Sequence, residues 1–347
     1  MVRAIYKTIF AMLAAIACSS TQADLGVAYS PWNHEHPTGD IILTDFKLIA
    51  RDFSFVRTFN VNIGNVNVVE IAAAAGIGID VGVDMTVKDK IDSEIKAVCD
   101  AYKMYSQTIR TVYVGNENLL NNGFGQYSVE EIIQYIKQVQ KCVGPDVRVG
   151  TVQRINEWLT VSGVEKIVEV STACGANIYP FFSNLGTMSP VQMLQAQWEQ
   201  IATKHGNMDK WSVSETGWSS GGPNPNGNTA SVEAAQEYLN DVALWSVNKT
   251  VIWFMFSDPI ISYNGMEIEK HFGIYDATCS TKKLVLPAKQ ISPNMSNTTS
   301  LPTPSKDQPV QQNAGDHSTP VTSGDQPQDV NKEMGKSSGT TGKDCAM

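Results

Sequence analysis

The sequence predicts an α/β fold, a single (β/α)8 TIM barrel followed by a polar C-terminal tail. Eight short runs rich in β-branched and aromatic residues recur along the chain, and segments with helical periodicity separate them. Strands that are apolar on both faces are typical of a parallel sheet covered by helices. The expected strands span residues 25–29, 53–59, 77–84, 109–115, 147–152, 176–181, 211–215 and 251–256.

Two of the intervening helices carry N-terminal capping signals. Residues 128–142 open with a Ser-x-x-Glu capping box formed by Ser128 and Glu131, and residues 230–247 have Ser231 as N-cap. The main rival fold is a doubly wound open sheet, which usually has a glycine-rich phosphate loop after its first strand. The stretch around the end of the first strand here, "AYSPWNHEHPTGD", is no such loop. The barrel is therefore favoured, and a body of about 265 residues is long enough for one.

Residues 1–23 have the pattern of a secretory signal peptide. Two basic residues precede an apolar run over residues 9–18, and "TQA" before Asp24 fits the small-residue cleavage pattern. The run is too short to span a bilayer, and no other stretch approaches the length of a membrane helix. We expect a mature chain that starts at Asp24 and is secreted to the extracellular space or the cell wall.

Residues 291–347 differ in composition from the body of residues 24–290, which we expect to form one catalytic domain. The tail is mainly Ser, Thr, Pro, Gln, Asp and Lys and has no aromatic residue. Such a segment buries too little apolar surface to offset its ordering entropy, so we expect a disordered stalk that can carry O-glycans. Its last residues, "TTGKDCAM", lack the hydrophobic tail of a glycolipid-anchor signal, so either the protein is not anchored in this way or the chain is truncated. Candidate N-glycosylation sequons occur at Asn248, Asn294 and Asn297.

The charge and the cysteine content narrow the expected partners. The net charge is −9 and no basic cluster occurs, so nucleic acid is not an expected partner. No His or Cys spacing indicates a metal site, and we expect a monomer without a cofactor. In an oxidising compartment, four cysteines are expected to form two disulfides by any of three pairings, with Cys345 left over. The four are Cys99, Cys142, Cys174 and Cys279.

In a parallel barrel, the residues at the C-terminal ends of the strands surround the active site. At these positions the sequence has mostly polar and aromatic residues: Tyr29, Arg57, Asp84, Asn116, Glu117, Gln153, Tyr179, Glu215 and Asp258. Glu117 and Glu215 stand out because each follows an apolar strand and precedes an irregular loop. Two carboxyl groups across a barrel mouth are typical of glycoside hydrolysis. One protonates the leaving oxygen, and the other attacks the anomeric carbon or activates water.

Each of these residues has a simpler interpretation when taken alone. Glu117 can be a solvated residue at the start of a helix, and Glu215 can be a surface acid that closes a strand. Asn116 can be a helix N-cap. The position of both acids at strand ends of one predicted barrel, on the fourth and the seventh strand, favours the catalytic interpretation.

The motifs "VYVGNE" and "SETGWSSGG", in this order, resemble the acid/base and nucleophile motifs of glycoside hydrolase family 17. Four further stretches, "GVAYSPW", "VRTFN", "NIYPFF" and "EKHFGIYD", are similar to other parts of the family pattern, and the resemblance covers residues 25–276. It looks closest to the fungal and oomycete type of cell-wall β-1,3-glucanase and glucanosyltransferase. The resemblance implies a retaining enzyme with a (β/α)8 barrel, in which Glu117 is the general acid/base and Glu215 the nucleophile.

Retention predicts different protonation states for the two acids. It needs two carboxyl groups about 5–5.5 Å apart, one neutral and one ionised. We expect burial and the charge of Glu215 to raise the pKa of Glu117. Glu215 is expected to accept hydrogen bonds from Arg57 and Tyr179. Asn116 resembles the residue that hydrogen-bonds the sugar 2-hydroxyl in related barrels.

Aromatic residues beside the predicted strand ends are expected to stack on sugar rings. These platforms are Tyr29, Trp32, Phe182 and Trp218. Trp253 lies within the last strand, and Trp198 and Trp245 lie on helical patterns, so we assign these three to the core.

After the eighth strand, the sequence departs from the family pattern. The family usually has an acid closely followed by a Lys, whereas here Asp258 can stand in for the acid but no Lys follows before Lys270. Glu269, in "EKHFG", aligns with a family acid. We include Asp258 and Glu269 among the predicted substrate-binding residues, and the departure leaves substrate-length preference and transfer efficiency open.

Three functions are consistent with the sequence. We favour a secreted glucan endo-1,3-β-glucosidase that acts in cell-wall polysaccharide metabolism, with β-1,3-glucan as its partner. A β-1,3-glucanosyltransferase would use the same residues with a sugar acceptor, and the sequence does not separate water from sugar as acceptor, or endo from exo action. A non-catalytic glucan-binding wall protein is the third candidate. The two acids argue against it, because binding alone needs neither a proton donor nor a nucleophile.

Overall fold

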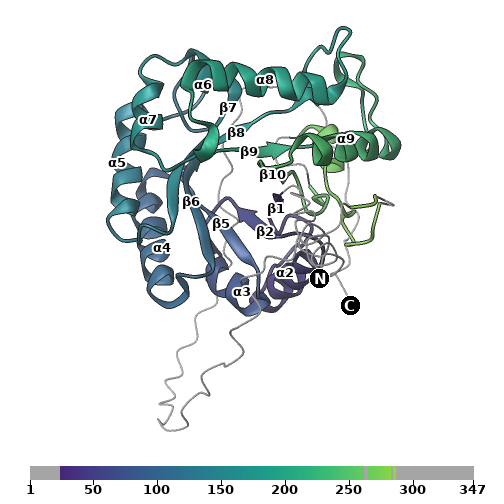
Figure 1. Ribbon diagram of the computed structural model, residues 1–347. Coiled ribbons are helices and arrows are strands. Elements are labelled where there is room, and N and C mark those ends of the chain that lie inside the picture. Colours follow the sequence, from purple (N-terminus) through teal and green to yellow (C-terminus); the bar gives the residue numbers. More distant parts are fainter. Residues whose placement is uncertain (1–23, 262–264, 283, 287–347) are drawn as a thin grey trace, which may run out of the picture.

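The computed structural model describes residues 24–261, 265–282 and 284–286. Within these residues, eight parallel strands close into a barrel with helices around its outside (Figure 1), which confirms the predicted fold class. The strand order around the barrel is β1-β10-β9-β8-β7-β6-β5-β2. The barrel strands are β1 (Asp24–Tyr29), β2 (Phe55–Thr58), β5 (Gly78–Val83), β6 (Ile109–Asn116), β7 (Arg148–Arg154), β8 (Ala173–Asn177), β9 (Trp211–Thr216) and β10 (Thr250–Trp253).

Helices follow the strands in the predicted alternation, and among the described residues none is both long and apolar enough to cross a membrane. The α-helices are α2 (Gly39–Asp52), α3 (Val68–Ala75), α4 (Ile91–Tyr105), α5 (Val129–Gln140), α6 (Ile155–Thr160), α7 (Val164–Val170), α8 (Pro190–His205) and α9 (Val232–Trp245). Short 3-10 helices are η1 (Lys88–Lys90), η2 (Pro180–Phe182), η3 (Met208–Lys210), η4 (Pro225–Gly227) and η5 (Glu267–His271). A small hairpin, β3 (Asn62–Ile63) and β4 (Val66–Asn67), lies between β2 and α3.

Both predicted helix starts are confirmed. The hydroxyl of Ser128 accepts a hydrogen bond from the backbone N–H of Glu131 at 3.2 Å, and the Glu131 carboxylate accepts one from the N–H of Ser128 at 2.9 Å. Ser231 accepts from the backbone N–H of Ala234 at 3.1 Å and caps α9. These side chains satisfy N–H groups that have no partner within the helix, which fixes where each helix begins.

The barrel strands are buried on both faces, and the tryptophans assigned to the core are buried or pack against it. Trp253 in β10 is 1% exposed and Trp198 in α8 is also buried. Trp245 in α9 is half-buried, and its ring meets that of Trp198 edge to face, with centroids 6.0 Å apart. The α8–α9 contact outside the barrel therefore rests on this aromatic pair.

One strand lies three residues earlier than predicted. We expected the sixth strand at residues 176–181, but β8 spans Ala173–Asn177. Its small residues are selected by their neighbours, because a Cβ added to Gly175 would lie 2.6 Å from Cγ2 of Val152 and 2.7 Å from Oγ of Ser214. Tertiary packing thus overrides the weak strand propensity of this segment.

One disulfide joins Cys99 in α4 to Cys142 just after α5, with Cα atoms 5.4 Å apart. Cys174 in β8 is a free thiol that is fully buried, and burial raises its pKa to about 12. The prediction that Cys174 takes part in a second bridge is therefore wrong, because its side chain is enclosed in the barrel wall. The signal peptide, the tail from residue 291, Cys345 and the sequons at Asn294 and Asn297 lie outside the described residues.

Candidate active site

Glu117 occupies a strained position at the end of β6. The register between β6 and β7 shifts between Tyr113 and Asn116, and Glu117 then has a φ of +54°. This left-handed conformation costs a non-glycine residue on the order of 1–3 kcal/mol and persists only where the surroundings enforce it. The backbone N–H of Glu117 donates to the carbonyl of Val152 in β7 at 2.9 Å, which is part of that enforcement. Such outliers cluster at functional sites.

Glu215 belongs to β9 and is 5% exposed. Nη1 of Arg57 donates to its Oε1 at 2.6 Å, and the hydroxyl of Tyr179 donates to its Oε2 at 2.8 Å. Arg57 is itself buried, and its Nη1 also donates to the carbonyl of Ser214 at 2.9 Å. Each oxygen of the carboxylate therefore has a donor, which stabilises its negative charge and fixes its orientation.

Asn177, at the end of β8, connects the two acids. Its Nδ2 donates to Oε1 of Glu117 at 2.6 Å and to Oδ1 of Asn116 at 3.2 Å. The same Asn116 oxygen accepts from Nη2 of Arg57 at 2.9 Å. Glu117, Asn177, Asn116, Arg57 and Glu215 thus form one hydrogen-bonded chain across four strands.

Sequence reasoning missed Asn177, because the predicted sixth strand began at residue 176. With β8 ending at Asn177, the rule that placed the other candidates at strand ends would have included it. The interpretation of Asn116 as a helix N-cap is excluded, since it is the last residue of β6 and no α-helix begins in this part of the chain before Val129.

The surroundings of Glu117 favour its protonated form. Burial and the nearby charge of Glu215 raise the pKa of Glu117 to about 8, although the hydrogen bond from Asn177 acts in the opposite direction. Glu117 therefore holds a proton near neutral pH and can donate it. The pKa increase that we expected for Glu117 is present, with burial as its largest cause.

Among the predicted aromatic platforms, Phe182 and Trp32 have accessible rings. Phe182 in η2 is 39% exposed, and Trp32, after β1, is partly buried. Trp32 stacks on Phe59 with ring centroids 6.4 Å apart, and Phe182 lies 5.9 Å from the ring of Tyr179. Phe59 follows β2 directly and is a further half-buried ring that sequence reasoning did not single out.

Two predicted platforms lie in the core instead, so their assignment to substrate contact is wrong. Tyr29 is 1% exposed, and its hydroxyl donates to Asp45 in α2 at 2.8 Å. Trp218 is 4% exposed, and its indole N–H donates to the carbonyl of Thr229 at 2.8 Å. Both residues lie at or just after a strand end, but their side chains turn toward the packed shell around the barrel.

The two acids after β10 also differ from expectation. Asp258 is 8% exposed and both of its oxygens face Nζ of Lys282, at 2.6 and 2.5 Å, so the carboxylate is not directed at a substrate as predicted. Burial of this ion pair accounts for the difference, because an unpaired carboxylate is costly there. Glu269 lies in η5 and is 7% exposed, and its role in substrate binding stays a prediction.

Comparison with known proteins agrees with this geometry. Residues 26–273 match the family described as the BtgE/BtgC glycoside hydrolase domain. The chain belongs to this glycoside hydrolase family. This family match, together with the relatives described below, confirms the family 17 type that the motifs resembled.

Two curated relatives of this glycoside hydrolase come from fungi. The chain is 26% identical over 249 residues to "Glucan 1,3-beta-glucosidase" of Schizosaccharomyces pombe, which covers 67% of this chain and 77% of the relative. It is 27% identical over 218 residues to "Probable glucan endo-1,3-beta-glucosidase eglC" of Emericella nidulans, which covers 56% of this chain and 45% of the relative. The chain thus spans less than half the length of the second relative.

Solved structures share the barrel. A glycoside hydrolase family 17 β-1,3-glucanosyltransferase from Rhizomucor miehei matches with a TM-score of 0.64 and 24% identity, over 77% of this chain and 98% of that one. An active-site mutant of the Rhizomucor miehei β-1,3-glucanosyltransferase in complex with laminaritriose matches with a TM-score of 0.64 and 25% identity, over 78% and 99%. The part of this glycoside hydrolase that matches therefore corresponds to nearly the full length of those chains.

Proposed function

We propose that the protein hydrolyses β-1,3-glucan with retention of configuration, through a covalent glycosyl-enzyme. The observation that carries the proposal is the pairing of a carboxyl that keeps its proton, Glu117, with a carboxylate held by two donors, Glu215. An acid and a nucleophile at the C-terminal ends of barrel strands are the groups that this reaction needs. The names of the fungal relatives support β-1,3-linked glucose as the substrate.

The proposed mechanism gives a role to the two acids and to the residues that hold Glu215. Glu117 protonates the bridging oxygen while Glu215 attacks the anomeric carbon, so the glycosidic bond breaks as the bond from carbon to Glu215 forms. Arg57 and Tyr179 hold Glu215 in position for this attack. Glu117, now ionised, takes a proton from the incoming water, which cleaves the covalent intermediate and restores both carboxyl groups.

Asn116 and the exposed rings are proposed to orient the sugar. Oδ1 of Asn116 already accepts from Arg57 and Asn177, which directs its amide NH₂ to donate to the 2-hydroxyl, a contact that strengthens in the transition state. The ring of Phe182 and the half-buried rings of Trp32 and Tyr179 offer apolar faces for pyranose rings.

We also propose that the protein is secreted and glycosylated. The disulfide between Cys99 and Cys142 is typical of an oxidising compartment, in line with the signal-peptide pattern of residues 1–23. Asn248 is exposed in a turn between α9 and β10, with a φ of +63°, the kind of surface position at which an N-glycan is attached.

A second candidate function is glucan transfer. It is favoured by the similarity to the Rhizomucor miehei β-1,3-glucanosyltransferase, which covers 98% of that chain. Transfer uses Glu117 and Glu215 unchanged, and the hydroxyl of a second glucan chain takes the place of water in the step that cleaves the intermediate.

One assay distinguishes these functions. The protein is incubated with a linear β-1,3-glucan oligosaccharide, product sizes are followed over time, and the anomer first released is identified by NMR. Shorter products of β configuration support retaining hydrolysis, and products longer than the substrate indicate transfer. No turnover at all, or release of the α anomer, would overturn the proposal.

Glu215→Gln tests the assignment of the nucleophile. The amide cannot form the glycosyl ester, so turnover is expected to fall by about 10⁴-fold or more. Glu199→Gln, on the exposed face of α8, is the matched control and should keep normal activity. Near-normal turnover by Glu215→Gln would remove Glu215 from the mechanism.

A further inference from the structure

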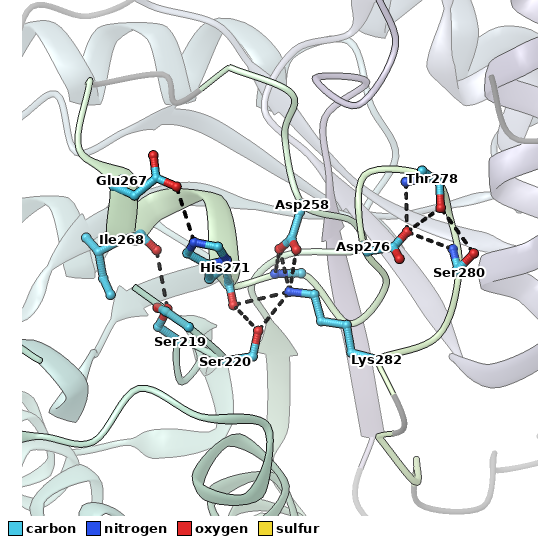
Figure 2. Close-up of polar contacts among 12 residues, drawn as sticks. Ser219, Ser220, Asp258, Glu267, Ile268, His271, Asp276, Thr278, Ser280 and Lys282 are labelled. Atoms are coloured by element: carbon cyan, nitrogen blue, oxygen red, sulfur yellow. Dashed lines mark hydrogen bonds and ion pairs between the residues drawn. The ribbon is translucent and has the colours of Figure 1, made fainter. Parts of the chain in front are cut away.

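A buried lysine lies beyond the residues that match the family. Lys282 follows the matched stretch of residues 26–273 by nine positions, and its side chain is 10% exposed. Figure 2 shows its Nζ at the centre of four contacts. The nitrogen lies 2.6 and 2.5 Å from the two oxygens of Asp258, 2.9 Å from Oγ of Ser220 and 3.3 Å from the carbonyl oxygen of His271.

These contacts join three loops at the same end of the barrel. Asp258 follows β10, and Ser220 follows β9, the strand that carries the proposed nucleophile. His271 is the last residue of η5. Ser220 also donates to the His271 carbonyl from its backbone N–H and from its hydroxyl, each at 2.9 Å. Burying an ammonium group is costly unless it is paired and hydrogen-bonded, and Lys282 has both kinds of partner.

Asp258 in turn fixes the backbone next to Phe272. Its Oδ1 accepts from the backbone N–H of Gly273 at 2.9 Å, and a Cβ on Gly273 would lie 2.3 Å from the Asp258 nitrogen, so the two backbones are in close contact. On the other side of this contact, the carbonyl of Phe272 accepts from the N–H of Met255 at 3.1 Å. Phe272 is therefore fixed through its two neighbours, because the carbonyl of His271 contacts Lys282 and the N–H of Gly273 contacts Asp258. Its own carbonyl is held by the chain after β10.

Phe272 in turn supports the aromatic side of the candidate site. Its ring is 2% exposed and stacks on the exposed ring of Phe182 with centroids 5.7 Å apart and an interplanar angle of 28°. It also meets Tyr179 edge to face at 5.9 Å. A path thus leads from Lys282 through Asp258 to Gly273, and from the adjacent Phe272 to the ring proposed to bind sugar.

We propose that Lys282 is a positioning residue that sets the affinity for the glucan chain by holding Phe272 beneath Phe182. The proposal rests on the proposed function, since it concerns the substrate of the same site. Binding is affected more than the chemical step, because Glu215 is held by Arg57 as well as by Tyr179 and keeps its strongest donor.

The variant that tests this proposal has to remove the ion pair without leaving a charge buried. Lys282→Met alone would leave Asp258 uncompensated and is expected to be strongly destabilised. Lys282→Met combined with Asp258→Asn removes both charges and keeps an acceptor for the Gly273 N–H. Lys270→Met is the matched control, because Lys270 pairs with Glu267 at the surface of the neighbouring η5.

The experiment measures KM and kcat separately on a linear β-1,3-glucan oligosaccharide, together with the melting temperature. The paired variant is expected to raise KM about tenfold, because the ring of Phe182 is no longer held in place for the sugar, with kcat nearly unchanged. Lys270→Met should change neither. If the paired variant folds and its KM is unchanged, the role proposed for Lys282 is wrong and the proposed function still stands. If the wild-type protein shows no turnover, the proposed function and this inference are both overturned.

A second variant tests the route of the effect. Phe272→Leu removes the ring beneath Phe182 and is expected to raise KM to a similar extent. If Lys282 acts through Phe272, adding the paired variant to Phe272→Leu raises KM by much less than the product of the two separate effects. Independent, multiplicative effects would overturn the proposed route.

Discussion

At the scale of single residues, the hydrogen bond from Asn177 to Glu117 adjusts the proton affinity of the proposed acid. Burial and the Glu215 charge raise the pKa of Glu117 to about 8, and the Asn177 amide lowers it because it donates to the ionised form. The acid acts when protonated, so kcat/KM should fall as the pH rises through about 8. Asn177→Ala removes the donor and should move this alkaline limb to higher pH in a pH–rate profile.

Ser214→Ala is the control for this prediction. It removes the hydroxyl that donates to Oδ1 of Asn177 at 2.8 Å, but it leaves the contact between Asn177 and Glu117 in place. The alkaline limb should therefore keep its position in Ser214→Ala. A limb that moves to lower pH in Asn177→Ala would contradict the assignment of Glu117 as the group that titrates.

Asp80 predicts an effect on stability rather than on activity. It is fully buried in β5, and Nε of Arg110 lies 4.0 Å from its Oδ1. Burial raises the pKa of Asp80, with Arg110 opposing it. Because the folded state holds the proton more tightly than the unfolded state, this carboxyl loses stabilising effect as the pH rises above its unfolded pKa.

Asp80→Asn should therefore gain in the free energy of unfolding relative to wild type as the pH rises from 4 to 7. Urea unfolding at both pH values measures the difference, and Asp89→Asn, an exposed acid before α4, is the control that should show no such trend. A larger loss of stability at pH 7 than at pH 4 would mean that the ion pair with Arg110 outweighs the cost of burying the Asp80 charge.

At the scale of elements, the sequence predicts what depends on local pattern and fails where packing decides. The long apolar strands were placed within a few residues, and the capping residues Ser128 and Ser231 marked two helix starts. The strand β8 was misplaced because its small residues fit only against their neighbours. Asn177 was lost with that strand, which shows that a single register error can hide a site residue.

The disulfide between Cys99 and Cys142 is predicted to stabilise the α4–α5 side of the barrel. It closes a loop of 43 residues that contains β6, and a crosslink of this span is worth about 2–4 kcal/mol, mostly by constraining the unfolded chain. Cys99→Ala combined with Cys142→Ala should lower the free energy of unfolding by this amount in denaturant titrations.

Reduction provides the control for the disulfide. Because Cys279 is also disulfide-bonded, a thiol reductant can lower the stability of both proteins, but the fall should be larger for the wild-type protein than for the double variant. The remaining thiol of Cys174 is fully buried and does not contribute to the difference. If the double variant is as stable as wild type, the link between α4 and α5 has no role in stability.

At the scale of the whole molecule, the site draws on residues that no motif connects. Glu117 and Glu215 were predictable because each follows a recognisable strand, and their donors Arg57 and Tyr179 follow two others. The directions in which the side chains of Tyr29 and Trp218 point were not predictable, because a position at the end of a strand does not show whether the side chain faces the site or the surrounding helices. Lys282 was unpredictable for a further reason: it meets Asp258 across 24 positions only through the return of the chain onto the barrel.

The segment around Lys282 packs back onto the barrel, and this contact predicts where the domain ends. The sequence places the boundary at residue 290, and Leu284 and Leu286 pack against the core just before it. A chain of residues 24–290 should therefore keep the Lys282–Asp258 ion pair and the activity of the longer protein. A chain of residues 24–276 lacks Lys282 and leaves Asp258 without its partner, which should cost about 3–5 kcal/mol of folding free energy. Asp258→Asn placed in the 24–276 chain should regain part of this loss by removing the unpaired charge, as measured by thermal and denaturant unfolding. If the substitution regains nothing, the buried ion pair is not what makes the segment around Lys282 part of the domain.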